Sequence, residues 1–188
     1  MRPNVSVRCV LLLVLAAVLV SCAHAGTSPA TAGVPPDLAP CAVSRAGMPI
    51  PGGLPDVTLG CLGHGPTVRL ATIRGPAVIN VWASWCAPCQ QEMPSLQRAH
   101  REQGGRIHFI GVNTRDLRGS ALGFLGAEHV SYEQLFDPQA TLAARLAAPG
   151  LPMTVAIDTS GRIVWRKAGQ LHAGDLPAAM RAATGGGG

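Results

Sequence analysis

The clearest chemistry in this sequence belongs to two cysteines, Cys86 and Cys89. An alanine and Pro88 separate them, and Trp85 precedes them. A C-x-x-C pair can form a disulfide, bind a metal or attach haem. Haem attachment requires a histidine directly after the second cysteine, where this chain has Gln90, and zinc requires a second ligand pair at compatible spacing, which the sequence does not offer. We therefore predict a redox-active dithiol, with no metal and no other cofactor.

The elements around this pair explain how it could react. An apolar run at 77–83 predicts a buried strand, and a helix is expected at 87–103, ending at two glycines. Because a helix N-terminus stabilises negative charge, Cys86 is predicted to be the nucleophile with a lowered pKa. Cys89, one turn further into the helix, is predicted to be the more buried, resolving cysteine. Pro88 suits the first turn, and Trp85 is expected to shield the pair and contact a partner.

The remaining pattern predicts one α/β domain with a mixed sheet. An entry hairpin is expected at 56–60 and 67–71, a second buried strand at 106–113, and a closing hairpin at 153–158 and 162–168. Further elements are expected as a helix at 117–128, a strand at 132–136, a helix at 138–147 that begins with Pro138, and a helix at 175–183. Trp82 is assigned to the core, and Arg115, Asp116 and Arg118 are assigned to a solvated loop.

Two motifs resemble a known family. The run from Val78 to Pro94, which contains W-C-A-P-C and then E-M-P, resembles the active-site signature of the TlpA/ResA/DsbE-like branch of the thioredoxin superfamily. Gly150–Thr154 resembles the cis-proline loop of that family. The resemblance covers about residues 54–180 and implies a thioredoxin-like three-layer sandwich, its mixed central sheet flanked by helices, with an N-terminal β-hairpin extension. It also implies that Pro152 is cis and that Leu151 offers its backbone to a client strand.

The chain departs from thioredoxin at one position near the site. Thioredoxin has a buried aspartate where this chain has Asn80, and an amide cannot take up a proton. Glu92, three residues after Cys89 and on the same helical face, is a candidate to handle the proton of Cys89. The alternative is that Glu92 is solvated or pairs with an arginine.

Cys41 and Cys61 are predicted to form a structural disulfide, because Cys86 and Cys89 pair locally. The bond would hold a segment rich in proline and glycine that cannot form a helix. The alternative is a second redox pair that passes electrons to the first.

The N-terminus is typical of exported proteins. Arg2 and Arg8 precede an apolar run of eleven residues at 10–20, which fits a signal peptide and is too short to span a bilayer comfortably. Leu19 to Cys22 resembles a bacterial lipobox, so lipidation at Cys22 is expected, with cleavage near Ala25 and secretion as the alternative. We predict a signal peptide at 1–21, a flexible tether at 22–40, a thioredoxin-like domain at 41–184 and a disordered tail at 185–188.

The expected function is thiol–disulfide exchange at the outer face of the plasma membrane. The partners would be client proteins with thiols or disulfides and a membrane electron donor or acceptor; the resemblance suggests apocytochrome c as one client. Alternatives are an oxidase of exported proteins or a non-catalytic module that binds a partner or a metal. Without the signal peptide the chain has 13 basic and 10 acidic side chains, and these are scattered, which gives little support to nucleic-acid binding.

Overall fold

The structure is a computed structural model that describes residues 33–41 and 47–185. The predicted signal peptide, Cys22, the first part of the predicted tether and residues 186–188 lie outside the described residues. Within the described part, no helix is long and apolar enough to cross a membrane.

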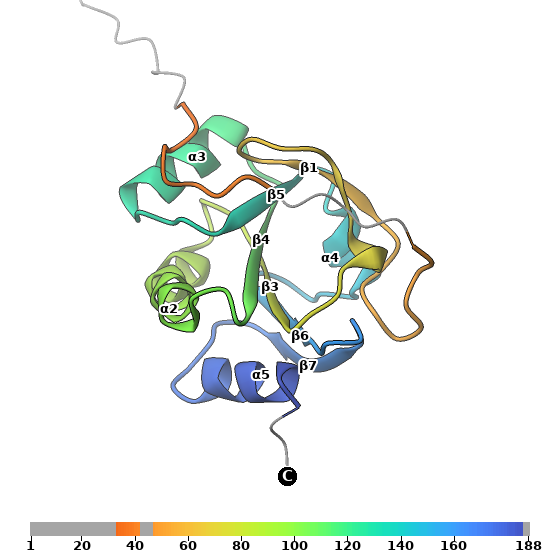
Figure 1. Ribbon diagram of the computed structural model, residues 1–188. Helices are drawn as coiled ribbons and strands as arrows, with labels where there is room; N and C mark the ends of the chain where they lie inside the picture. The colour runs from red at the N-terminus through yellow and green to blue at the C-terminus, as the bar shows by residue number, and fades with distance from the viewer. Residues whose placement is uncertain (1–32, 42–46, 186–188) are drawn as a thin grey trace, which may run out of the picture. The chain divides into compact units, whose positions relative to one another are not determined.

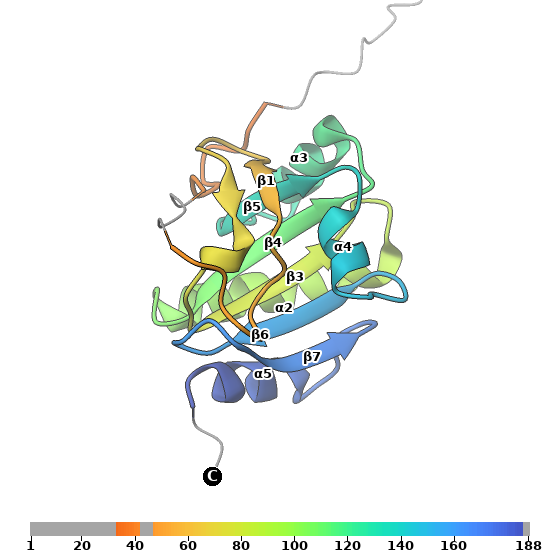
Figure 2. The ribbon, with the colours of Figure 1, turned by 90° about the vertical axis from the view of Figure 1, so that its right-hand side faces the viewer.

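Seven strands form one mixed sheet, seen from two sides in Figures 1 and 2. The strands are β1 (Thr58–Cys61), β2 (Val68–Arg69), β3 (Ala77–Trp82), β4 (His108–Thr114), β5 (Glu133–Asp137), β6 (Met153–Ile157) and β7 (Ile163–Ala168). Their order across the sheet is β2-β1-β5-β4-β3-β6-β7. Strands β3, β4 and β5 are parallel to one another, and the other neighbours pair antiparallel. The predicted mixed sheet is confirmed.

Helices cover both faces of this sheet, because its central strands are apolar on both sides. All six residues of β3 are buried, as expected for a strand enclosed by two layers. Helices α2 (Ala87–Gln103), α3 (Arg118–Ala127) and α5 (Asp175–Ala183) pack on the face that carries Val78 and Trp82. The short helix α4 (Thr141–Arg145) and the 3₁₀ turn η1 (Leu70–Thr72) pack on the face that carries Ile79 and Val81.

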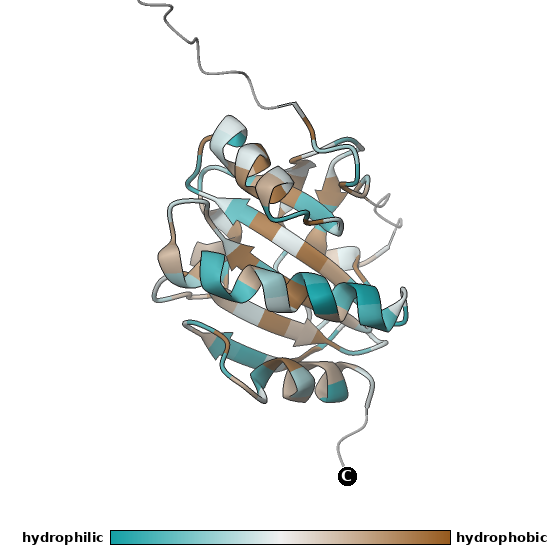
Figure 3. Cartoon of the chain, turned by 90° about the vertical axis from the view of Figure 1, so that its left-hand side faces the viewer, coloured by the Kyte–Doolittle hydropathy of each residue, from teal (hydrophilic) through white to brown (hydrophobic). Residues whose placement is uncertain are grey.

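Figure 3 views the α2 face and shows how hydropathy follows this layering. The outward side of α2 is largely hydrophilic, whereas the strands behind it are largely hydrophobic. The side chains that α2 buries include Cys89, Glu92 and Met93. A carboxylate among these buried residues is an exception that needs a physical reason.

The predicted bounds of α2 and α5 match the structure, but the helix predicted at 138–147 does not begin at its proline. Helix α4 begins at Thr141 instead. The carboxylate of Asp137 accepts hydrogen bonds from the backbone N–H groups of Thr141 (2.8 Å) and Leu142 (2.9 Å), so the helix begins where this acceptor can reach its free N–H groups. Pro138 lies in the preceding turn.

The segment at 33–41, most of which was expected to be flexible tether, packs against the domain. Leu38 is buried with an exposed fraction of 6%, and the Ala39 N–H donates to the carbonyl of Ser131 (2.9 Å). The Cys41 N–H donates to the carbonyl of His64 (2.9 Å). The sequence of this segment has no helical or strand periodicity, yet its Val34 and Leu38 pack with the core cluster that includes Leu122 and Leu125 of α3.

Candidate active site

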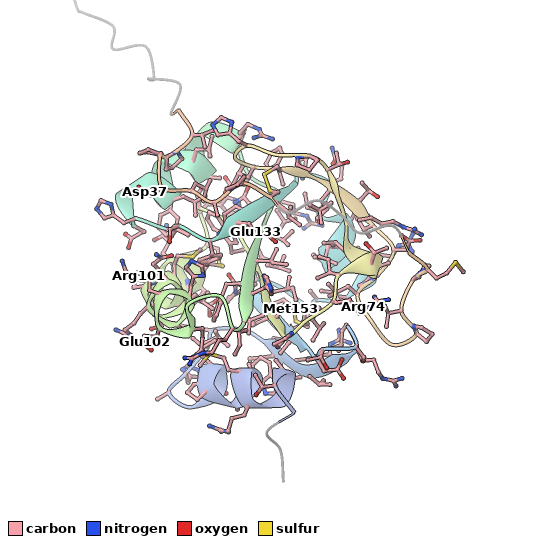
Figure 4. The ribbon with its side chains drawn as sticks, in the orientation of Figure 1. Asp37, Arg74, Arg101, Glu102, Glu133 and Met153 are labelled. Carbon is pink, nitrogen blue, oxygen red and sulfur yellow. A yellow bond between two sulfur atoms is a disulfide. The ribbon has the colours of Figure 1, made fainter. Side chains whose placement is uncertain are left out.

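The C-x-x-C pair lies where β3 gives way to α2. Cys86 and Cys89 form a disulfide, with Cα atoms 5.2 Å apart. Cys86 retains an exposed fraction of 5% and Cys89 has none, which is the predicted difference in burial. Figure 4 draws the side chains and marks disulfides as yellow bonds.

Cys86 occupies the cap position of α2. Its backbone is extended, and its sulfur accepts from the backbone N–H of Cys89 at 3.3 Å. Pro88 is the second residue of the helix, where it has no hydrogen bond to lose. This N–H group and the positive end of the helix both favour negative charge on the Cys86 sulfur once the disulfide is opened.

Glu92 is the buried carboxylate noted above, with an exposed fraction of 2%. Its Oε1 accepts from Asn80 Nδ2 (2.7 Å), and its Oε2 accepts from the backbone N–H of Leu171 (2.8 Å). Burial raises the pKa of Glu92 above its ordinary value, and the two hydrogen bonds oppose that rise. The alternative of a solvated or arginine-paired Glu92 is therefore wrong.

Asn80 links Glu92 to the strand that follows the cis-proline loop. Its Nδ2 also donates to Thr154 Oγ1 (3.0 Å), and its Oδ1 is buried without a hydrogen-bond partner. An amide presents a donor on one side and an acceptor on the other. After half a turn of its side chain, Asn80 could accept from a protonated Glu92 as well as donate to an ionised one.

The predicted client contacts lie at the same edge of the sheet as the disulfide, because Val81 near the end of β3 pairs with Met153 at the start of β6. The Leu151–Pro152 peptide bond is cis, as expected, and the next residue, Met153, lies in the interior at the start of β6 (Figure 4). Trp85 is exposed to 60%, and its indole N–H donates to the carbonyl of Arg115 (2.8 Å). Leu151 is half-buried.

Trp82, by contrast, is fully buried, and its indole N–H donates to Gln134 Oε1 (2.9 Å), which confirms its assignment to the core.

The residues predicted to form a solvated loop, Arg115, Asp116 and Arg118, are exposed or half-buried, and they also hydrogen-bond to neighbouring segments. Asp116 accepts four hydrogen bonds, two of them from Ser84, which lies two residues before Cys86. Arg118 donates to the carbonyls of Cys61 (2.9 Å) and Leu62. Sequence reasoning missed the contacts of Asp116 with Ser84 and of Arg118 with Cys61 and Leu62, because they join segments more than 30 residues apart. The available signal was an acidic residue soon after a buried strand.

The second disulfide joins Cys41 to Cys61, with Cα atoms 5.8 Å apart, as predicted. Both cysteines belong to the core cluster on the opposite face of the sheet from Cys86 and Cys89. Carbonyl oxygens lie near the two sulfurs: Gln134 O is 3.3 Å from Cys41 Sγ, and His64 O is 3.0 Å from Cys61 Sγ. In the described ranges no three His, Cys, Asp or Glu side chains gather so that they could hold a metal ion.

A mixed sheet with a C-x-x-C pair at a helix N-terminus and a cis-proline loop beside it defines a thioredoxin-like protein. The Redoxin family matches residues 45–182, so this chain belongs to that family. The resemblance to the DsbE-like branch is confirmed by the relatives that the sequence matches.

Three known proteins illustrate the similarity. The chain is 40% identical over 102 residues to the thiol:disulfide interchange protein DsbE homolog of Paracoccus denitrificans, covering 53% of this chain and 55% of that protein. It is 31% identical over 124 residues to the thiol:disulfide interchange protein CycY of Rhizobium leguminosarum, covering 62% of this chain and 66% of that protein. The solved structure of a DsbF homologue from Corynebacterium diphtheriae superposes with a TM-score of 0.62 at 27% identity, covering 69% of this chain and 85% of that one. The matched region thus spans about half to two thirds of the curated relatives.

Proposed function

We propose that this chain is an extracytoplasmic thiol–disulfide oxidoreductase in which Cys86 is the nucleophile and Cys89 the resolving cysteine. One observation carries the proposal: the Cys86 sulfur caps α2 and accepts the N–H of Cys89, which favours a thiolate at the position nearer the surface. The relatives named as thiol:disulfide interchange proteins support the same chemistry.

The exchange balances as a transfer of two electrons and two protons. The Cys86 thiolate attacks one sulfur of a client disulfide; the client bond breaks, and its second sulfur leaves as a thiolate and takes a proton from solvent. Cys89 then loses its proton and attacks the Cys86 sulfur. The Cys86–Cys89 bond forms, the mixed disulfide breaks, and the first client sulfur leaves and is protonated. A reduced donor reverses these steps on the chain.

Glu92 is the proposed acceptor for the proton of Cys89. It lies one turn along α2 from Cys89, and burial raises its pKa toward the range in which a carboxylate can take up a proton. Asn80 and Thr154 would orient the carboxylate, because the Asn80 amide donates to the Glu92 carboxylate and also to the Thr154 hydroxyl, which holds the amide in place. Where thioredoxin has an ionisable aspartate, this chain thus has an amide that can hydrogen-bond to either protonation state of Glu92.

The client would lie against Trp85 and the cis-proline loop. Trp85 offers exposed apolar area, and Leu151 lies two residues before Met153, the first residue of β6, so its backbone could pair with an extended client strand. An unfolded or partly folded client supplies such a strand most readily.

The proposed location is outside the cytoplasm, with the chain lipid-anchored at Cys22 to the outer face of the plasma membrane. The signal-like N-terminus supports export, and the Cys41–Cys61 disulfide suits a compartment in which disulfides persist. We assign that disulfide a structural role, because the carbonyl oxygens beside its sulfurs disfavour thiolates.

The proposed direction is reduction of disulfides in exported proteins, with apocytochrome c as one client and a membrane protein as electron donor. The direction is tested by equilibrating the Cys86–Cys89 pair with glutathione. A potential of about −270 mV would mark a reductant, whereas one of about −120 mV would mark an oxidase and overturn the direction while leaving the exchange chemistry in place.

A further inference from the structure

The loop after β4 lies directly beside the segment that carries the nucleophile. Strands β3 and β4 are parallel neighbours, with Trp82 paired to Asn113 at their ends, so both chains leave the sheet at the same edge. The residues that follow β3 lead to Cys86, and the residues that follow β4 include Asp116.

The Asp116 carboxylate uses both oxygens to join the two loops. Oδ2 accepts from the Ser84 backbone N–H (2.5 Å) and from Asn113 Nδ2 (2.8 Å). Oδ1 accepts from Ser84 Oγ (2.9 Å) and from the Leu117 backbone N–H (2.8 Å). Ser84 is therefore held through its backbone and its side chain by one carboxylate, and bonds to an ionised acceptor are the stronger kind.

Two further contacts extend this link toward α2. The indole N–H of Trp85 donates to the carbonyl of Arg115, whose φ of 48° lies in the left-handed region that non-glycine residues rarely adopt. The Ser84 carbonyl accepts from Gln90 Nε2 in α2 (2.6 Å). The residues on both sides of the nucleophile are thus held to fixed partners.

We propose that Asp116 is a positioning residue for thiol–disulfide exchange, because its carboxylate fixes Ser84 and thereby holds Cys86 against the first turn of α2. This inference rests on the proposed function. Stabilisation of a thiolate by a helix N-terminus is short-ranged, so a small displacement of the sulfur from the Cys89 N–H weakens it. Asp116 acts through this geometry, although its own negative charge works in the opposite sense.

The test separates geometry from charge with two substitutions. Asp116→Glu keeps the charge but moves the carboxylate, and Asp116→Asn removes the charge and turns one acceptor into a donor. The readout is the pH dependence of the rate at which iodoacetamide alkylates Cys86 in the reduced protein, followed by peptide mass spectrometry. We expect the midpoint to rise by about half a pH unit in both variants, the size of a helix N-terminal effect, and the rate below the midpoint to fall about threefold.

The chain offers a matched control in Asp158. Its carboxylate also holds a serine through backbone and side chain, accepting from Ser160 N (2.9 Å) and Ser160 Oγ (2.6 Å), but it lies at the far end of β6 from Pro152. Asp158→Asn is expected to lower the melting temperature without moving the midpoint. Should Asp116→Asn fail to fold, Ser84→Ala, which removes only the 2.9 Å bond, is expected to raise the midpoint by a smaller amount.

Two results would overturn the inference. An unchanged midpoint in Asp116→Glu would make Asp116 a purely structural residue, and a lowered midpoint in Asp116→Asn would show that its charge outweighs its geometry. Neither result contradicts the proposed function. That proposal is contradicted by a different result, namely that Cys86 of the unmodified protein is unreactive at pH 7.

Discussion

The two disulfides in the described part of the chain are buried to a similar degree, yet their sulfurs lie beside opposite ends of the peptide dipole. The Cys86 sulfur lies 3.3 Å from a backbone N–H, whereas those of Cys41 and Cys61 lie 3.3 Å and 3.0 Å from carbonyl oxygens. An N–H stabilises a thiolate, and a carbonyl oxygen stabilises a thiol that donates to it. The comparison suggests that local backbone direction, rather than burial, distinguishes a reactive pair from a stable one.

The largest effect is expected when the reactive pair is removed. Cys86→Ser removes the nucleophile and Cys89→Ser removes the resolving thiol, so each variant should lose catalysed reduction of insulin by dithiothreitol and return to the uncatalysed rate. The double variant Cys41→Ser/Cys61→Ser is the matched control and should retain activity. Activity that survives in both single variants would remove the redox assignment from Cys86 and Cys89.

Removal of the Cys41–Cys61 disulfide is expected to lower the stability of the protein rather than its activity. The cysteines are 20 residues apart in sequence, and in the chain-entropy model a bond that closes such a loop contributes about 3 kcal/mol. We expect the free energy of unfolding of Cys41→Ser/Cys61→Ser, measured in urea, to fall by about that amount. A folded double variant that loses insulin reduction would instead favour the second redox pair.

The sequence was informative where the signals are local. The bounds of α2 follow from Pro88 in its first turn and the glycines after its end, and the reactive pair follows from cysteine spacing. The partners of the site are not local: Glu92 bonds to Leu171, 79 residues later, and Ser84 to Asp116, 32 residues later. No periodicity or turn signal encodes such a pair, because it exists only once the sheet is formed.

Helix α4 shows a different kind of error. A proline in the first turn is a common helix start, and Pro138 satisfied that rule, but the carboxylate of Asp137 was the stronger determinant. A short helix with one buried side chain, Leu142, offers too little periodicity to decide between two starting points.

Proton transfer from Cys89 gives the next prediction. If Glu92 takes that proton, Glu92→Gln should slow release of a client from its mixed disulfide with Cys86 by about a hundredfold at neutral pH, within the usual range for a general base. The mixed disulfide with a cysteine-containing peptide should accumulate and be visible by mass spectrometry. Glu102→Gln, on the exposed side of the same helix (Figure 4), is the control and should behave like the unmodified protein. Equal release rates in both variants would contradict the role of Glu92.

The same residue predicts a pH dependence of stability with a definite sign. Burial raises the pKa of Glu92 in the folded state, so the folded state binds the proton more tightly than the unfolded chain. Its contribution to stability is present below the unfolded pKa of about 4.3 and is lost as the pH rises through the folded pKa. Relative to Glu92→Gln, the unmodified protein should therefore lose stability in urea between about pH 4 and neutrality. If the difference in unfolding free energy between the unmodified protein and Glu92→Gln does not vary with pH, the pKa of the Glu92 carboxyl is not raised by folding.

The smallest effect is expected at Arg118, which links the stable disulfide to the loop beside the reactive one. Its guanidinium donates to the carbonyls of Cys61 and Leu62 and lies 4.9 Å from the centre of the Phe136 ring. Arg118→Gln should lower the free energy of unfolding by about 1 kcal/mol, because the chain loses charged hydrogen bonds and a cation–π contact at a partly exposed position. Alkylation of Cys86 should keep its midpoint, since Ser84 is held by Asp116 and not by Arg118. Two results would show that the two disulfides are energetically coupled through this arginine: a shifted alkylation midpoint, or a loss of unfolding free energy that vanishes when Cys41 and Cys61 are both serine. The contrast between a reactive region and an independent stable region would then no longer hold.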